Sequence, residues 1–242
     1  MTSQPIAKSV PIGRGLGWMT DAWPYFAKSP GTWVLITLIL GILSIGVSLI
    51  PGGQILISLL TPVLSAGLLA GCAAQQSGER ISVTQLFAAF SHPRLGRLML
   101  LGLLALLGYA LCLILFVIGL YLFIGGAALS LHQGLPPELG IFGIVLVVLI
   151  GMASMVPVMM ASWFAPALVV FRDLSATQAL LQSFFACLRN VFPFLIYGLV
   201  LFVLFFVATI PLGLGLLIVF PMVVASVYVA YRDIFSTDGD KG

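Results

Sequence analysis

Six long apolar runs, separated by short polar segments, constrain this chain of 242 residues more than any other feature. A helix that crosses a bilayer needs about 20 predominantly apolar residues, and no Asp, Glu, Lys, Arg or His falls inside any of the six runs. A bilayer admits only helices and closed barrels, and runs of this length are typical of helices. We therefore predict an all-α, polytopic membrane protein with spans at 33–50, 54–74, 98–125, 141–171, 194–210 and 213–231.

The composition excludes two broad classes of protein. Charged residues make up 7% of the chain, against about 25% in a typical soluble domain. The formal net charge of +3 is too small to indicate the basic surface of a nucleic-acid-binding protein. We expect neither a soluble domain nor a nucleic-acid partner.

The basic residues fall on one side of the predicted membrane. They lie before the first span, between the second and third, between the fourth and fifth, and after the sixth: Lys8, Arg14, Lys28, Arg80, Arg94, Arg97, Arg172, Arg189, Arg232 and Lys241. The opposite turns, "IPGGQ", "LHQGLPPELG" and "IPLGLG", contain no Lys or Arg. Because Lys and Arg are enriched in cytoplasmic loops, we predict a multi-pass protein whose basic segments face the cytoplasm. Both termini are expected in the cytoplasm, with flexible ends at 1–14 and 236–242.

A similar phrase recurs in the second helix of each predicted hairpin. The strings "PVLSAG", "PVMMAS" and "PMVVAS" begin at Pro62, Pro157 and Pro221, and alanine follows each proline by four residues. We interpret the chain as three helical-hairpin repeats, parallel because each unit crosses the membrane twice. The units are about 15–77, 82–173 and 175–235. The alternative is that short apolar strings recur by chance in a restricted alphabet.

A short amphipathic segment precedes each hairpin. Ser82 with Gln85, and Ser175 with Gln178, match the capping box that begins a helix. In the third unit one face is apolar and another polar, which predicts a helix in the membrane interface. The apolar face is Leu181, Phe184, Phe185 and Leu188, and the polar face is Gln178, Gln182 and Arg189. The first unit lacks the cap, and we expect Trp18, Trp23 and Tyr25 to anchor it.

The middle unit is longer than the other two. Apolar sequence runs from Leu98 to Leu131, well beyond the roughly 20 residues that a bilayer requires. Two alternatives follow: the hairpin projects or bends, which we favour, or Gly125 and Gly126 end the helix early.

Few residues are suited to catalysis or metal binding. The two histidines, His92 and His132, fall on opposite sides of the predicted membrane and cannot share a metal. The cysteines Cys72, Cys112 and Cys187 match no metal or redox spacing. There is no Gly-x-Ser-x-Gly string of the kind that presents a nucleophilic serine. We predict no enzyme activity, no cofactor and no metal.

Two sets of residues are candidates for other roles. Charged residues at cytoplasmic helix ends are candidate contacts for lipid headgroups or a partner, or alternatively simple helix-end anchors. They are Lys28, Arg94, Arg97, Arg172, Asp173, Arg189, Arg232 and Asp233. Prolines and small residues in the second helices allow bends and close approach, so we expect them to pack around the repeat axis. They are Pro62, Gly67, Gly71, Pro157, Ser162, Pro166, Pro221, Ser226 and Ala230. Trp163 and Phe164 are either core residues or lining for an apolar ligand.

Three stretches carry a family resemblance. "VPIGRGLGWMTDAWPYFAKSPGTW", "SWFAPALVVFRDLSATQALLQSFFACLRNVFPFLIYG" and the closing "YRDIF" resemble an uncharacterised family of six-helix inner-membrane proteins of proteobacteria. The layout is similar, more loosely, to the membrane domain attached to some glycerophosphodiester phosphodiesterases. The resemblance implies a bacterial inner membrane and an all-helical fold, and it supplies no catalytic residues.

Two functions fit these observations. The first is a non-catalytic membrane protein, an organiser or accessory subunit, that binds lipid or a protein partner. Its expected partners are anionic lipid headgroups on the cytoplasmic side, another membrane protein, or further copies of the chain. The alternative is a transporter or flippase for a lipid or another apolar or amphipathic molecule. A closed core of small residues on the repeat axis favours the first function, and a lipid-accessible chamber there favours the second.

Overall fold

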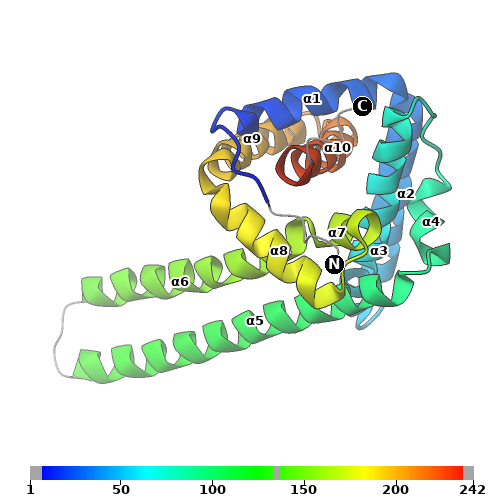
Figure 1. The fold of residues 1–242 in the computed structure, drawn as a ribbon. Helices are drawn as coiled ribbons and strands as arrows, with labels where there is room; N and C mark the ends of the chain where they lie inside the picture. The colour runs from blue at the N-terminus through cyan, green and yellow to red at the C-terminus, as the bar shows by residue number, and fades with distance from the viewer. Residues whose placement is uncertain (1–6, 133–136, 237–242) are drawn as a thin grey trace.

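The computed structural model describes residues 7–132 and 137–236, without the side chains of 126–141. Within these ranges the chain is helical and contains no strand. The elements in Figure 1 are α1 Arg14–Lys28, α2 Pro30–Ser48, α3 Gly53–Gln76, α4 Gln85–Ala88, the 3-10 turn η1 Ala89–Ser91, α5 Leu95–His132, α6 Pro137–Trp163, α7 Ala165–Arg172, α8 Ala176–Arg189, α9 Val191–Thr209 and α10 Leu216–Phe235.

Six segments are long and apolar enough to cross a membrane, as predicted. Five of them follow single helices, and their ends differ from the predicted spans by a few residues. The fourth is broken at Phe164 into α6 and α7. Gly52 and Gly213 make the tight turns of the first and third hairpins, with φ of +79° at each, which glycine adopts without steric cost.

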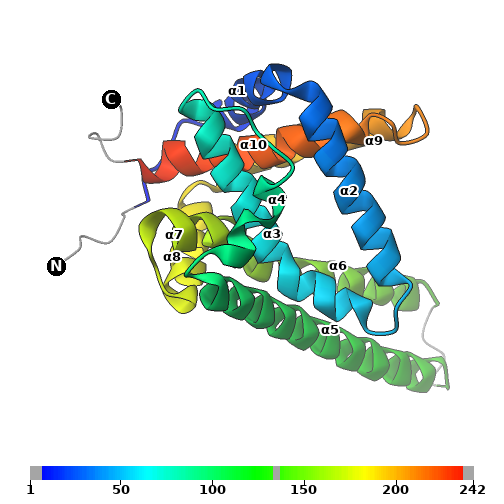
Figure 2. The same cartoon turned by 90° about the vertical axis from the view of Figure 1, so that its right-hand side faces the viewer.

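The three hairpins point in different directions from a shared body. Figure 1 shows α1 across the top of the body, α2 and α3 descending from it, and the α5–α6 pair extending to one side. In Figure 2 the α2 and α3 helices diverge from their connecting turn, and α9 and α10 lie across them. The predicted three-hairpin layout is therefore recognisable, but the hairpins do not run parallel to one another.

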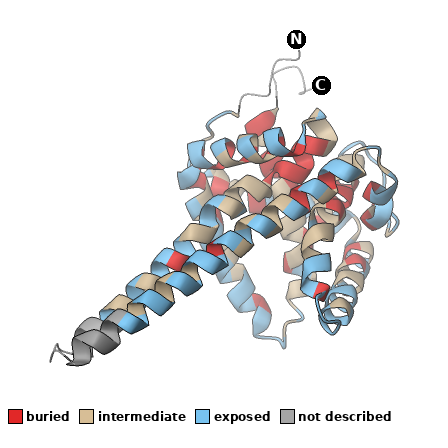
Figure 3. Cartoon of the chain, turned by 90° about the horizontal axis from the view of Figure 1, so that it is seen from below, coloured by how far each residue is buried: buried red, intermediate tan, exposed pale blue. Residues whose placement is uncertain are grey.

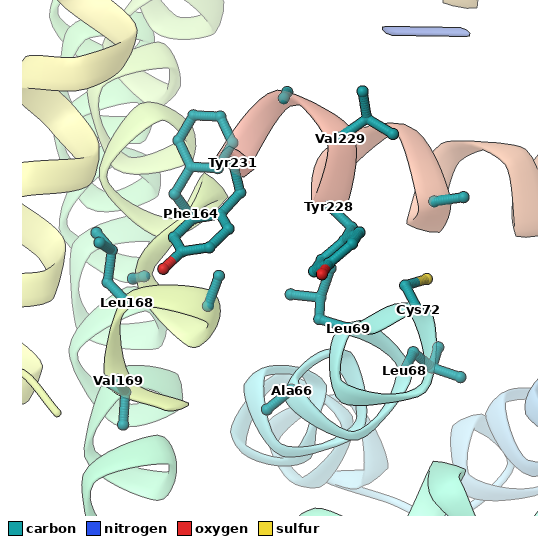
Figure 4. Packing of buried hydrophobic residues seen from close by; sticks show 14 of the residues in the cluster. Ala66, Leu68, Leu69, Cys72, Phe164, Leu168, Val169, Tyr228, Val229 and Tyr231 are labelled. Carbon is teal, nitrogen blue, oxygen red and sulfur yellow. The ribbon is translucent and has the colours of Figure 1, made fainter. Parts of the chain in front are cut away.

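The body is held by the second half of each hairpin. Helices α3, α7 and α10 supply about half of the buried side chains, and Figure 4 shows them facing one another. Phe164 contacts Phe235 with ring centroids 5.6 Å apart, and Phe171 contacts Tyr228 at 6.0 Å. We call this cluster the axial core: Val63, Ala66, Leu69, Cys72, Phe164, Ala165, Leu168, Phe171, Ala225, Tyr228, Val229, Tyr231 and Phe235.

The candidate axis residues divide into three groups. Pro166, Pro221, Ser226 and Ala230 are buried, and Pro62 and Ser162 are partly buried. Gly67 and Gly71 are buried, but an added Cβ on either would meet Gln85. Gly67 and Gly71 therefore face the segment before the second hairpin, and Ala66 and Leu69 occupy the side of α3 that faces the axial core. Pro157 is exposed, so its predicted place on the axis is wrong: α6 packs on α5 and α8 instead.

The α5–α6 hairpin forms an arm that projects from the body (Figures 1 and 3). At 1.5 Å per residue, the 38 residues of α5 span about 57 Å, against about 30 Å of bilayer hydrocarbon. The helix runs unbroken to His132, so an end at Gly125 and Gly126 is wrong and the projecting hairpin is confirmed. Gly151 faces the ring of Phe116, which lets the two helices approach closely.

The segments before the hairpins differ in regularity. Around α8 the capping box is complete, with Ser175 and Gln178 each bonding the other's backbone. In the second unit only half of the box forms: the Ser82 N–H donates to Gln85 Oε1 at 3.1 Å, and the helix is four residues long. The predicted cap at Ser175 begins the 14-residue helix α8, whereas in the second unit the N-cap is Thr84, two residues after the predicted Ser82.

The chain before α1 is bound to the body. The Lys8 N–H donates to the Ile234 carbonyl at 2.8 Å, and the Val10 N–H donates to Asn190 Oδ1 at 2.9 Å. The predicted flexible N-terminus is therefore held at residues 8 and 10. Residues 1–6, and 237–242 of the predicted flexible tail, lie outside the described residues.

Candidate functional site

Charged side chains gather where the hairpins join the body, around the ends of α1, α5, α7, α8 and α10. We call this region the charged end. It contains all eight predicted headgroup or partner contacts, and Arg14, Asp21, Glu79 and Arg80 besides. His92 also lies here, on the η1 side, while the side chain of His132 lies outside the described residues.

Arg94 and Arg97 converge on the C-terminal end of α7. Arg94 Nε lies 2.6 Å and Arg97 Nη1 2.8 Å from Asp173 Oδ1. The same guanidinium groups donate to the carbonyls of Val170 and Asp173, which are unpaired acceptors at a helix end. Asp173 has φ of 58°, a left-handed cap conformation that Asp tolerates.

The pKa of the Asp173 carboxyl group reflects the two guanidinium groups beside it. Desolvation alone would raise the pKa of its carboxyl group. The Arg94 guanidinium, followed by Arg97, overcomes that effect and holds the pKa below its usual value. The cluster fastens the start of α5 to the end of α7, so these three candidate contacts serve as internal anchors.

Three further candidates also bond backbone carbonyls. Arg172 donates to the Phe235 carbonyl at 2.8 Å, and Lys28 donates to that of Gln75 at 3.3 Å. Arg189 donates to the carbonyl of Ala7. Each of these carbonyls belongs to a helix end or to the N-terminal segment, so the contacts match the helix-end interpretation.

A second ionic cluster joins α1 to α10. Arg14 Nη2 lies 2.6 Å from Asp233 Oδ2 and 2.9 Å from Asp21 Oδ2. Trp18 Nε1 also donates to Asp233 Oδ2, at 2.9 Å. Trp18 is fully buried, so its predicted role as an interfacial anchor is wrong: its indole satisfies a carboxylate inside the body. Trp23 remains exposed at 51%.

A cleft of about 260 Å³ opens beside this cluster. The α1–α10 cleft is lined by Arg14, Asp21, Tyr25, Val229, Arg232, Asp233 and Ser236. Arg232 and Asp233 were predicted contacts, whereas Tyr25 was expected only as an anchor. Arg232 lies beside Tyr25, and within 7–132 and 137–236 it has no carboxylate partner. It differs in this from Arg14, Arg94 and Arg97, which are all ion-paired.

Three buried polar side chains were missed by sequence reasoning. Asn190 accepts from Val10 N–H and donates to the carbonyls of Lys8 and Ala186. Ser183 Oγ accepts from Phe164 N–H at 2.9 Å and donates to the Met160 carbonyl at 2.7 Å. A side chain inserted into the helical ladder in this way contributes to the break between α6 and α7. Tyr197 and Ser226 share a hydrogen bond of 2.7 Å between α9 and α10.

The described residues show little that suits redox or metal chemistry. Burial raises the pKa of the Cys187 thiol to about 12, which leaves little of the reactive thiolate at neutral pH. No group of three or more His, Cys, Asp or Glu lies close enough to hold a metal in the described part of the chain. Trp163 and Phe164 contact Phe194 at centroid distances of 6.1 and 5.8 Å, as core residues do.

The fold and the charged end define an α-helical, multi-pass membrane protein. Over 200 residues the chain is 30% identical to "Probable inner membrane protein BTH_II0599" of Burkholderia thailandensis. The match covers 78% of this chain and 73% of that relative. The chain belongs to this family of inner-membrane proteins. No family model and no solved structure matches it.

Proposed function

We propose that the protein is a non-catalytic organiser or accessory subunit that binds membrane lipid at its charged end. The observation that carries this proposal is the packing of the axial core. A carrier needs a path along the repeat axis, whereas here Ala66, Phe164 and Ala225 are almost completely buried against their neighbours. The looser resemblance to the membrane domain of glycerophosphodiester phosphodiesterases stays a prediction and carries none of this argument.

The exposed sides of α1 support a position in the membrane interface. Its buried residues, Trp18, Met19, Ala22 and Phe26, share one face. Leu16 and Trp23, seven residues apart, are each about half exposed on one flank, and Ile12 in the turn before the helix is exposed as well. Arg14, Asp21, Tyr25 and Lys28, spaced by seven, four and three, occupy another. A helix with one apolar and one polar exposed flank suits the boundary between lipid and water.

Helix α8 supports the same position. It turns small residues such as Ala179 and Ser183 toward the body. Its large apolar residues point outward, with Leu181 59%, Phe185 60% and Leu188 51% exposed. In the second unit Phe87 and Phe90 are exposed beside each other. Exposed apolar stripes opposite a small-residue face are favourable where lipid covers them.

The charged end supports an attraction to lipid headgroups. Eight basic residues and four acidic ones lie there among the described residues. Basic segments next to spanning helices are attracted to anionic lipid surfaces. Most of the basic groups also have internal partners, so we expect the attraction to be diffuse except at the α1–α10 cleft.

A second candidate function is a transporter or flippase. The break between α6 and α7 favours it, because discontinuous helices form substrate sites in many transporters. Here, however, the freed groups at the break bond Ser183 within the body. A flipping assay in reconstituted vesicles with fluorescent phospholipid separates the two functions. If an external quencher removes the fluorescence of the inner-leaflet lipid faster than in protein-free vesicles, the transporter is favoured.

Native mass spectrometry of the whole protein, extracted with its surrounding membrane and without detergent, tests lipid binding. We expect a stoichiometric phospholipid that survives collisional activation. A protein that co-purifies at fixed ratio, with no retained lipid, would instead make the chain an accessory subunit that binds protein. Copies of the chain at fixed ratio without lipid would indicate a homo-oligomer and would also contradict the proposal.

A further inference from the structure

We propose that the α1–α10 cleft binds a zwitterionic headgroup that carries a phosphate diester and a primary ammonium. The phosphate is bound at Arg232 and the ammonium at Asp21 and Asp233. The inference rests on the proposed lipid binding and adds the site and the headgroup class. It also differs from the anionic headgroups that the basic loops predict.

The positive half of the cleft is Arg232. Its guanidinium lies beside Tyr25 and has no carboxylate partner among the described residues. Ser236 also lines this half. A guanidinium presents a planar set of donors that matches phosphate oxygens, and neighbouring hydroxyls can donate as well. Arg14, the other arginine that lines the cleft, lies beside carboxylates. A phosphate group would supply the corresponding anion for Arg232.

The negative half is the cluster of Arg14, Asp21 and Asp233. One guanidinium lies between two carboxylates, so the three groups together carry a net charge of −1. Asp233 accepts from Arg14 and Trp18 through Oδ2, and Asp21 accepts from Arg14 through Oδ2. Within the described ranges both Oδ1 atoms have no hydrogen-bond partner. A carboxylate has about four acceptor positions, so each retains capacity for an ammonium group, which donates three.

The two halves share one small space. The volume of about 260 Å³ is below the roughly 300 Å³ at which pockets for drug-sized ligands begin. It suits a headgroup and excludes a whole phospholipid. Val229 is the apolar residue that lines the cleft, and the apolar flank of α1 with Leu16 and Trp23 lies on the other side of that helix from Asp21. Acyl chains would therefore lie outside the cleft, along apolar surface.

The test uses the full-length protein and water-soluble dihexanoyl phospholipids with ethanolamine, choline or glycerol headgroups. Titration calorimetry gives the Kd of each. We expect the ethanolamine lipid to bind about tenfold more tightly than the other two, the effect of one charge-assisted contact. The choline lipid lacks N–H donors, and the glycerol lipid lacks the cation. Equal Kd values for all three lipids would overturn the inference.

Two variants and a control assign the two halves. Arg232→Gln should weaken all three lipids about tenfold. Asp21→Asn, which removes only one half-exposed ion pair, should remove the preference for ethanolamine over choline. Gln54→Ala changes an exposed polar side chain outside the charged end and should change neither Kd nor preference. Far-ultraviolet circular dichroism of each variant confirms its folding. If folded Arg232→Gln keeps the wild-type Kd values, the site is wrong.

The phosphate and ammonium of the ligand have two sources, a lipid or a soluble phosphoethanolamine. Competition with O-phosphoethanolamine separates them: weak competition supports the lipid, and a Kd equal to that of the ethanolamine lipid assigns the cleft to a soluble ligand. If mass spectrometry retains lipid but calorimetry shows no headgroup preference, the proposed function stands and the inference fails. If neither method detects lipid, both fail.

Discussion

Helices α9 and α10 belong to one hairpin, yet they have opposite surroundings. In an 18-residue apolar stretch of each helix, 50% of the residues are buried in α10 and 17% in α9. The first hairpin repeats the difference, with 44% for α3 and 11% for α2. Helix α10 is the least apolar of the six spans, and α9 is among the most apolar. Lipid is as apolar as a side chain, so hydrophobicity does not bury a membrane helix; small residues and polar contacts do.

The middle hairpin modifies this comparison. In the apolar stretch of the fourth spanning segment, Phe142–Arg172, only 6% of the residues are buried, because α6 leaves the body together with α5. The hairpin's share of the axial core is supplied by the separate helix α7. The break at Phe164 thus lets the α5–α6 hairpin project while α7 still packs in the core.

The largest expected difference is between two phenylalanines. Phe164 is completely buried and contacts Phe194 and Phe235, so Phe164→Ala should lower the free energy of unfolding by about 3–5 kcal/mol. Phe202 in α9 is 69% exposed, and Phe202→Ala should change it by about 0.5 kcal/mol or less. Reversible unfolding of both variants in mixed micelles measures the difference. Equal losses would mean that α7 is not part of the core.

A smaller effect is expected within one helix. Gly102 of α5 faces the backbone of Leu59, and a Cβ there would lie 2.6 Å from the Leu59 carbonyl oxygen. Gly102→Ala should therefore cost about 1–3 kcal/mol of stability. Gly119, on the arm, has nothing within 4 Å of an added Cβ, so Gly119→Ala should be neutral or slightly stabilising. Thermal unfolding of the pair compares body with arm, and a destabilised Gly119→Ala would show that the arm has a partner.

At the break, Pro166 interrupts the helical hydrogen bonds, and the Ser183 hydroxyl bonds backbone groups on the α6 side and at the break itself. Ser183→Ala removes both hydrogen bonds that Ser183 Oγ makes to Phe164 and Met160, and leaving such buried groups unpaired costs about 1–3 kcal/mol. Ser48→Ala in α2 removes an exposed hydroxyl that bonds only its own helix and serves as the control. If both variants unfold at the wild-type temperature, Ser183 does not hold the break.

The smallest effect is expected at Asp173, and it depends on pH. Its pKa is lower in the folded protein than in the unfolded chain, so its contribution to stability is present above the ordinary carboxyl pKa of about 4. That contribution is lost as pH falls through the lowered folded value. Asp173→Asn should unfold at a lower temperature than wild type at pH 7, and the difference between the two unfolding temperatures should become smaller in acid. Glu79→Gln, at another exposed carboxylate, should show no gap at either pH.

Much of the fold was predictable from the sequence because a bilayer forces apolar runs into helices. The spans, the one-sided charges and the α8 cap all follow from local pattern. The directions of the hairpins were not predictable, because they depend on contacts such as Gly102 with Leu59 between distant segments. The α6–α7 break depends in part on Ser183, an ordinary serine in the sequence, 19 residues from Phe164.

The candidate site was predicted in part. Sequence reasoning named Arg232 and Asp233, but it could not separate them from Arg94 and Arg172, because all are charged residues near a helix end. The distinction comes from internal partners: Asp173 pairs with Arg94, and Phe235 accepts from Arg172, while Arg232 lines a cleft. Trp18 was misassigned because an indole near a membrane surface is typical of an anchor, and its carboxylate partner lies 215 residues away.

Labelling of the wild-type protein by lipid itself tests the closed axial core most directly. The protein is reconstituted into nanodiscs whose acyl chains carry a photoactivated carbene precursor, and the labelled residues are mapped by peptide mass spectrometry. We predict labels on α2, α9 and the arm, at residues such as Leu199 and Phe206, and none between Val63 and Cys72 or between Ala225 and Tyr231. Labels in those two core segments at the level of α9 would show an axis open to lipid, and the transporter would then be the better account.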